Sequence, residues 1–308
     1  MHTKRFKFAG VVFTIADAHE SASLGIGDLG LEAYAVPVTD MEAEQLPTIH
    51  CRVRYGGSDF ADLSAQGYTT TIYKAGFNDL RRYIYEEPLG GWLWVEKYMT
   101  RFSRFLCRIQ ADWKAFDIVF EGDRSQFAQL FYLFFFDLVA FTLLSHAGMV
   151  LHGVVIEHQN KAVILSAPSQ TGKSTHAGLW VDLGLARVVN GDRALLKQGT
   201  YWQTYGLPWC GTSGQSLNIT LPLQAIVFLE QSNKNTIEAL STVDGLLRIR
   251  QNLFVPDWAL DVCRNMLDLS AALLDSVPVY LLRCRPDEQA VHTLRRELDR
   301  LKSQEKSR

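Results

Sequence analysis

The sequence predicts an α/β protein, α+β overall, in which a β-rich N-terminal half precedes a half where strands and helices alternate. Two observations lead to this prediction. Before residue 124, short runs of β-branched and aromatic residues are separated by Gly, Pro and Asp, as in strands joined by turns. After it, a long apolar helix is followed by apolar strands and a glycine-containing loop. We therefore expect two domains, 1–124 and 125–308.

The N-terminal half is expected to consist mainly of strands. These are Phe8–Ile15, Ile49–Tyr55, Tyr68–Tyr73, Trp92–Tyr98, Phe105–Ile109 and Phe116–Phe120. Their aromatic side chains are expected in the core, because aromatic residues are common in half-buried strands. No pattern in this half points to a reaction, but an edge strand is a candidate site for adding an extended peptide.

An apolar stretch, Phe127–Leu144, has the composition of a membrane span. Asp137 lies in its middle, and a carboxylate at the centre of a bilayer costs about 3 kcal/mol on insertion scales. The stretch is also shorter than the ~20 residues that a spanning helix needs. We therefore expect a buried core helix and no membrane partner.

A phosphate-binding loop is predicted in the second half, where strand Lys161–Ser166 runs into Ala167–Thr175, with the sequence A-P-S-Q-T-G-K-S-T. The P-loop pattern is G-x-x-x-x-G-K-[ST], in which backbone N–H groups and a helix N-terminus surround phosphates. Lys173 would reach the β and γ oxygens, and Ser174 would coordinate Mg²⁺. Ala167 replaces the first glycine, so an ordinary φ is required there. We expect a nucleoside triphosphate, most simply ATP, to bind.

The other elements of this half follow the order of an α/β nucleotide site. The expected strands are Met149–Glu157, Ala186–Asn190, Trp202–Tyr205, Ala225–Glu230 and Val279–Arg283, and the expected helices are Gly172–Leu183, Val243–Asn252, Trp258–Leu274 and Asp287–Lys302. The candidate nucleotide-binding residues are Ser169, Gln170, Thr171, Gly172, Lys173, Ser174, Thr175 and Arg193.

A second group of polar residues lies near the neighbouring strands. Asp192 directly follows Ala186–Asn190, where a carboxylate can reach the Mg²⁺ that bridges the β and γ phosphates. The alternative is a turn aspartate, since such turns are common. Arg193 either touches phosphate or pairs with an aspartate. His152 interrupts an apolar strand, where a lone histidine is usually a satisfied core residue.

Two further segments carry candidate residues with open alternatives. The loop Gly206–Gly214 holds Thr212 and Ser213 between glycines, and it either frames the acceptor or γ-phosphate or simply connects two strands. Arg248 and Arg250 either supply a cation to the transition state or lie on a solvated helix face.

The composition excludes several classes of function. The chain has 308 residues, 47% apolar and 21% charged, enough for one large core or two smaller ones. A formal net charge of −2 gives no global attraction to nucleic acid or to an anionic membrane. The five cysteines are scattered, odd in number and without C-x-x-C spacing, so neither a disulfide framework nor a zinc site is suggested. No signal peptide is recognised, and a cytoplasmic location is expected.

Three segments together, His152–Val154, Ser166–Thr175 and Asn190–Arg193, resemble the catalytic domain of bacterial HPr kinase/phosphorylase. The likeness is closer to the HPr-kinase-like kinases of lasso-peptide gene clusters, which phosphorylate a serine near the peptide's C-terminus. The resemblance implies a fold shared with phosphoenolpyruvate carboxykinase and a requirement for ATP and Mg²⁺. The N-terminal half matches no family that we recognise.

The resemblance also implies roles for individual residues. Lys173 would stabilise the phosphates, Ser174 and Asp192 would hold Mg²⁺, and His152 would assist a carboxylate in accepting a proton from the acceptor. HPr kinases carry two consecutive aspartates before the arginine, and the first is their expected base, whereas this chain has Gly191 there. Either Asp192 takes both roles or His152 is the base. This loss argues against phosphorylase chemistry more than against kinase activity.

The function expected from these residues is that of an ATP-dependent serine kinase, with a ribosomally made precursor peptide as its favoured substrate. The alternatives are a kinase of a small molecule, such as a free amino acid or sugar, and a non-catalytic ATP-binding regulator. Phosphoenolpyruvate carboxykinase itself is disfavoured, because no second set of metal ligands is found. The oligomeric state is left open.

Overall fold

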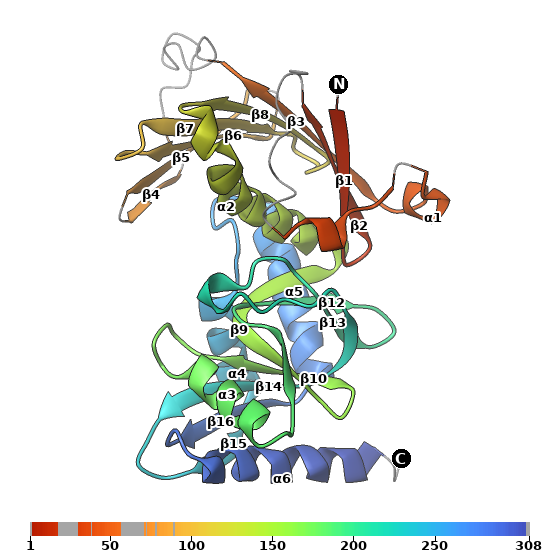
Figure 1. The fold of residues 1–308 in the computed structure, drawn as a ribbon, viewed down its shortest axis with the longest axis vertical. Coiled ribbons are helices and arrows are strands. Elements are labelled where there is room, and N and C mark those ends of the chain that lie inside the picture. Colours follow the sequence, from red (N-terminus) through yellow and green to blue (C-terminus); the bar gives the residue numbers. More distant parts are fainter. Residues whose placement is uncertain are drawn as a thin grey trace. The chain divides into compact units, whose positions relative to one another are not determined.

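The computed structural model describes residues 2–17, 30–37, 39–56, 71, 73–77, 79–88 and 90–305. The chain divides into two compact units (Figure 1). Unit 1 comprises Met1–Thr142 with Asp257–Leu260, and unit 2 comprises Leu143–Pro256 with Asp261–Arg308. Each unit is built on its own β-sheet with helices against it, so the chain has the α/β fold that the sequence predicts.

The described residues of unit 1 form an eight-stranded sheet in the order β1-β2-β3-β8-β7-β6-β5-β4. The strands are β1 (His2–Phe8), β2 (Val11–Asp17), β3 (Thr48–Tyr55), β4 (Tyr73–Phe77), β5 (Leu80–Glu86), β6 (Trp92–Tyr98), β7 (Ser103–Ile109) and β8 (Ala115–Glu121). Strands β1, β4 and β5 were not expected from the sequence, because their Lys and Arg residues obscure the apolar pattern. The expected strand Tyr68–Tyr73 lies mostly outside the described residues.

Helix α2 (Arg124–Leu143) packs its aromatic side chains on one face of this sheet. The ring of Phe134 lies 4.8 Å from those of Trp94 and Phe105, and the ring of Phe135 lies 5.7 Å from that of Phe13. Alternate residues of a strand point to the same face, so one set of side chains meets the helix and the other set faces away from it. The expected boundary at 124/125 lies before α2, whereas this packing includes α2 in unit 1.

The helical stretch Arg124–His146 is the one stretch among the described residues that is long and apolar enough to cross a membrane, with a mean hydropathy of 1.9. In this structure 72% of its most apolar window is buried, as expected for a core helix. Asp137 pairs with Arg82 at 2.5 Å. Arg82 also pairs with Glu96 at 2.8 Å and lies over the ring of Trp94. Burial raises the pKa of Glu96, and the charge of Arg82 opposes this rise.

We expect Arg82→Met to lower the free energy of unfolding by about 3–5 kcal/mol, because it leaves Glu96 and Asp137 buried without their cation. The matched control is Arg104→Met, which removes a half-exposed pair with Glu121 and should cost no more than about 1 kcal/mol. Urea denaturation of the full chain measures both. Equal losses of unfolding free energy in the two variants would contradict the role of Arg82 as the cation that neutralises Glu96 and Asp137.

The described residues of unit 2 form a second eight-stranded sheet, in the order β10-β9-β12-β13-β14-β16-β15, with β11 paired to β9 and a further pairing of β10 with β14. The strands are β9 (Gly148–His158), β10 (Lys161–Ser166), β11 (Arg187–Asn190), β12 (Arg193–Gln198), β13 (Trp202–Tyr205), β14 (Thr220–Gln231), β15 (Thr236–Ala239) and β16 (Val279–Cys284). Strands β12 and β15 were not expected. Arg193, Lys197 and Gln198 interrupt the apolar pattern of β12, and β15 has only four residues.

The long strand β9 changes partners halfway along its length. Its first half pairs with β12, with His152 opposite Arg193, and its second half pairs with β10, with Gly153 opposite Ser166. A Cβ atom on Gly153 would lie 3.0 Å from the carbonyl oxygen of Leu165, so a glycine suits this close contact. The end of β10 and the start of β12 are therefore adjacent across β9.

Helices α3 (Lys173–Asp182) and α6 (Glu288–Glu305) bury their apolar side chains against β9, β10, β14 and β16. Helices α4 (Thr242–Asn252) and α5 (Leu260–Ser276) touch where Gly245 lies against Leu274. Helix α5 begins two residues later than expected. Trp258 lies before it, in unit 1, stacked on Trp113 with ring centroids 5.7 Å apart.

Candidate functional site

The loop Ala167–Thr175, which the sequence predicts to bind phosphate, runs from the end of β10 into the start of α3. Gly172 precedes the first residue of α3 and has φ +109°, a conformation that favours glycine. Gln170 also has a positive φ, of 65°, whereas Ala167 does not. Alanine at the position of the first glycine of the motif therefore causes no backbone strain, and its methyl group is buried in the core of unit 2.

Lys173 lies folded against this loop. Its Nζ donates to the carbonyl oxygens of Ala167 at 2.8 Å and Pro168 at 3.2 Å. Burial lowers the pKa of the Lys173 ammonium, an effect that the charge of Asp192 opposes and that of Arg193 reinforces. The lysine is therefore within electrostatic reach of the Asp192–Arg193 pair. Ser169, Gln170, Ser174 and Thr175 are exposed, and Thr171 and Gly172 are half-buried.

His152, Asp192 and Arg193 meet beside the loop because of the register of β9 with β12. His152 Nε2 lies 3.3 Å from Asp192 Oδ1, and Asp192 Oδ2 forms an ion pair with Arg193. The guanidinium of Arg193 also lies 4.5 Å from the centre of the Phe254 ring. Each of the three polar side chains is about one quarter exposed, so all three border the surface. Of the two alternatives expected for Arg193, contact with phosphate or pairing with an aspartate, the structure has the pairing with an aspartate.

Electrostatics keep Asp192 ionised. Burial acts to raise the pKa of its carboxyl, but the hydrogen bond from His152 and the charges of Arg193 and Lys173 outweigh this effect and hold the pKa below its usual value. A carboxylate of low pKa is a weak proton acceptor but a suitable ligand for a cation. The geometry therefore fits Asp192 to metal binding better than to proton abstraction.

Asn190, which the sequence analysis treated only as part of a turn, organises the site. Its side-chain oxygen accepts hydrogen bonds from the backbone N–H groups of Asp192 at 2.9 Å and Arg193 at 2.8 Å. Its amide group donates to the carbonyl oxygens of Leu207 at 2.8 Å and Trp209 at 3.3 Å. The buried side chain thus joins the acidic turn to the loop Gly206–Gly214. An asparagine before Gly-Asp is a known turn signal.

The loop Gly206–Gly214 folds over Gly191 and Asp192. A Cβ atom on Gly191 would lie 1.9 Å from Ser213 Oγ, and one on Gly211 would lie 2.9 Å from Asp192 Cβ. Ser213 Oγ donates to the carbonyl oxygen of Cys210 at 2.7 Å and accepts from Gln215 N–H at 3.1 Å. The glycine at position 191 therefore has a steric reason, because Ser213 fills the space that a side chain would need.

Two cavities border the phosphate loop. The smaller, of about 310 Å³, is lined by Ser174, Gly191, Ser213 and Gln215 among others. The larger, of about 790 Å³, is lined by Thr171, Gly172, His176 and Glu230 among others.

His176, which no sequence signal singled out, lies at this larger cavity. Its Nε2 accepts from Trp180 Nε1 at 3.3 Å, so its Nδ1 carries the hydrogen, and Nδ1 has no hydrogen-bond partner among the described residues. Burial lowers the pKa of His176 to about 4, which leaves it neutral. The buried Nδ1–H is therefore a hydrogen-bond donor that has no partner among the described residues.

Arg248, Arg250 and Thr212 are the remaining candidates. Arg248 pairs with Glu230 at 2.6 Å, at the larger cavity, and Glu230 pairs with Arg283 as well. Arg250 is half-buried on α4. Thr212 is exposed in the loop beside Ser213. Within the described part of the chain, no cluster of three or more His, Cys, Asp or Glu side chains could hold a metal ion.

The chain matches no known family model and no curated protein. Among solved structures, it is similar to the HPr(Ser) kinase/phosphatase from Coxiella burnetii, with 14% sequence identity over 50% of this chain and 98% of that chain and a TM-score of 0.32. The likeness is distant, and we base the proposed function on the geometry of the site.

We expect Gly191→Ala to destabilise unit 2 by about 1–3 kcal/mol, because the new methyl group collides with Ser213. Adding Ser213→Gly should restore most of the loss. Gly178→Ala is the matched control: no atom lies within 4 Å of its new methyl group, and the change should stabilise helix α3 by up to about 1 kcal/mol. Thermal unfolding compares the variants, and a double variant as unstable as Gly191→Ala would refute the steric explanation.

We expect the stability that Asp192 supplies to disappear in acid. Its folded pKa lies below the ordinary 3.8, so the carboxylate stabilises the fold above that pH and loses this effect as the pH falls through the folded pKa. The difference in unfolding free energy between the wild type and Asp192→Asn should be similar at pH 7 and pH 5 and should shrink below about pH 4. Urea denaturation at each pH measures this difference. A difference that stays constant down to pH 3 would contradict the lowered pKa of Asp192.

Proposed function

We propose that this chain is an ATP-dependent kinase that transfers the γ-phosphoryl group to a serine hydroxyl of a peptide. The observation that carries the proposal is the register of β9, which brings the end of β10 at Ser166 beside Asp192 and His152. A phosphate loop, an ionised carboxylate and a histidine are the groups that phosphoryl transfer uses. We favour as acceptor a ribosomally made precursor peptide of the lasso type, modified near its C-terminus.

The donor phosphates would bind at the start of α3. Backbone N–H groups of residues 169–175 and the helix N-terminus attract the β and γ phosphates, and Lys173 turns from the loop carbonyls toward them. Arg193 supplies a second positive charge nearby. The cavity of about 790 Å³ beside Thr171 and Gly172 is large enough for the nucleoside, with His176 as a donor to it.

Ser174 and Asp192 would supply oxygen ligands to a Mg²⁺ ion. Mg²⁺ prefers such hard ligands and is usually held by one or two protein groups together with substrate phosphates and water. The low pKa of Asp192 keeps its carboxylate ionised for this role. When bound, Mg²⁺ neutralises charge on the β and γ phosphates.

His152 is our choice of base. The hydrogen bond to Asp192 places the proton of the neutral imidazole on Nε2, which leaves Nδ1 as the acceptor. In the transfer, the serine oxygen forms a bond to the γ-phosphorus while the bond to the β-phosphate oxygen breaks. ADP leaves, and the hydroxyl proton passes to Nδ1. Asp192 then stabilises the imidazolium ion.

The proposal also covers location and partners. The five cysteines are free thiols, which suits a reducing cytoplasm. Unit 1 would recognise the peptide, and we propose neither a nucleic acid nor a membrane as partner. The oligomeric state does not enter the proposal.

The test is to incubate the protein with ATP, Mg²⁺ and a panel of precursor peptides that end in serine, and to measure product masses. We expect a gain of one phosphoryl group on the terminal serine. Lys173→Ala should reduce the rate by about 100-fold or more, because it removes a charge that stabilises the transferred group. Lys234→Ala, which removes an exposed lysine of unit 2, should leave the rate unchanged.

Other outcomes separate the alternatives. Phosphorylation of free amino acids or sugars, with no peptide product, would replace the proposal with a small-molecule kinase. ATP binding without release of ADP or phosphate would indicate a non-catalytic regulator. Equal activity of the Lys173→Ala variant would exclude the site itself.

A further inference from the structure

Ser213 places a serine hydroxyl of the chain itself at the candidate site. It lines the cavity of about 310 Å³ together with Gly191 and with Ser174, the expected ligand of Mg²⁺. Its Oγ lies so close to Gly191 that a Cβ atom there would be 1.9 Å away. Ser213 is exposed. A hydroxyl of the type that the proposed reaction uses as acceptor therefore borders the same cavity as the phosphate loop.

The loop that carries Ser213 is held against the turn of Asp192. The backbone N–H of Gly191 donates to the carbonyl oxygen of Gln215 at 3.1 Å, and a Cβ atom on Gly211 would lie 3.0 Å from Asp192 Oδ2. These two contacts lie on either side of Ser213 in the chain. Ser213 is therefore kept beside the carboxylate that would bind Mg²⁺.

The hydroxyl of Ser213 can exchange its present partners. Its Oγ donates to the carbonyl oxygen of Cys210 at 2.7 Å and accepts from Gln215 N–H at 3.1 Å. Both hydrogen bonds are at an exposed position, where water can replace them. Gly211 and Gly214 flank the segment with φ values of 60° and 66°, and glycine tolerates a wide range of backbone angles. A rotation of this side chain toward the cavity therefore costs little.

We propose that Ser213 is a site of self-phosphorylation, at which the chain accepts the γ-phosphoryl group of its own bound ATP when no peptide is in place. This inference rests on the proposed function in taking ATP as the donor and the phosphate loop as its site. Ser213 Oγ forms a bond to the γ-phosphorus while the bond from that phosphorus to the β-phosphate oxygen breaks. ADP leaves, and the hydroxyl proton passes to water, because the side chain is exposed.

Two physical reasons favour this transfer. An acceptor that belongs to the same chain is held near the donor, so the reaction needs no encounter with a second molecule. Phosphoryl transfer passes through a loose transition state, in which positioning and charge neutralisation matter more than a strong base. Lys173 would neutralise charge on the transferred group for Ser213 as it does for a peptide serine.

The test is to incubate the full chain with ATP and Mg²⁺ in the absence of peptide, then to digest it and locate the phosphoryl group by mass spectrometry. We expect a gain of one phosphoryl group, at Ser213. Because the site is located in the wild type, a folding defect of a variant cannot produce this result. The rate per molecule should be the same at two protein concentrations that differ by about 10-fold, since the transfer is intramolecular.

Variants identify the acceptor. Ser213→Ala should abolish the gain, and Lys173→Ala should reduce its rate by about 100-fold or more. Thr212→Ala is the matched control, because it removes a neighbouring exposed hydroxyl that does not line the cavity, and it should retain phosphorylation of Ser213. A phosphoryl group found only at other residues, or a rate per molecule that rises with protein concentration, would overturn the proposal.

The peptide assay separates this inference from the proposed function. Phosphorylation of the peptide with none at Ser213 would overturn the inference and leave the proposed function in place. Phosphorylation of Ser213 with no peptide product would support the inference and contradict the peptide as acceptor. No phosphoryl transfer in either assay would overturn both.

Discussion

The side chain of Asn190 is the constraint on which the candidate site depends. It is buried, and all of its hydrogen bonds go to backbone groups: two N–H groups of the turn that carries Asp192, and two carbonyl groups of the following loop. A buried amide without these partners would be costly, so the turn and the loop are held in one arrangement. The position of the carboxylate is thereby fixed before any ligand binds.

Close backbone contacts follow from this arrangement. With the loop held against the turn, Gly191 and Gly211 face Ser213 and Asp192 at distances that leave no room for a side chain. The absence of a second aspartate at position 191 is therefore compatible with an intact site. In the reaction that we propose, His152 accepts the proton, and its contact with Asp192 would set the tautomer for that role.

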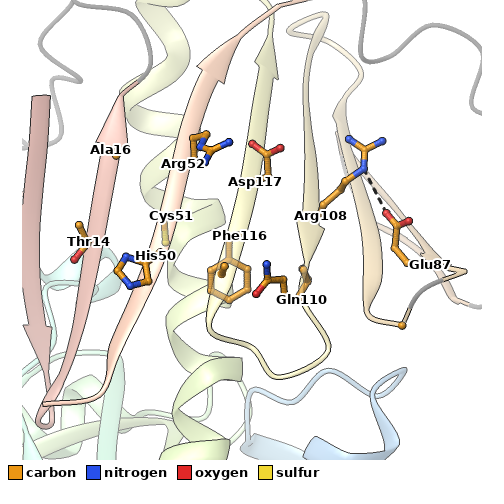
Figure 2. A pocket seen from close by; sticks show the side chains of 13 residues that line it. Thr14, Ala16, His50, Cys51, Arg52, Glu87, Arg108, Gln110, Phe116 and Asp117 are labelled. Carbon is orange, nitrogen blue, oxygen red and sulfur yellow. Dashed lines mark ion pairs between the residues drawn. The ribbon is translucent and has the colours of Figure 1, made fainter. Parts of the chain in front are cut away.

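In unit 1, strand alternation gives similar residue types different environments on the two faces of one sheet. Arg82 points to the face covered by α2, where it is mostly buried between two carboxylates. Arg52 points to the opposite face, where it is exposed at a cavity of about 590 Å³ (Figure 2). The first arginine satisfies buried charges and therefore stabilises the fold.

The sequence by itself determined the α/β class, the core helix after Arg124 and the place of the loop Ala167–Thr175 between a strand and a helix, because each depends on residues adjacent in the chain. Strands β1, β4, β5, β12 and β15 were not predicted, because pairing with neighbouring strands outweighs a short or charged local pattern. Only the tertiary structure decided that Trp258 packs in unit 1, that His152 meets Asp192 and that Ser213 fills the space at Gly191. It also decided where the cavity around Arg52 lies. These relations depend on strand register between distant segments, which no local pattern encodes.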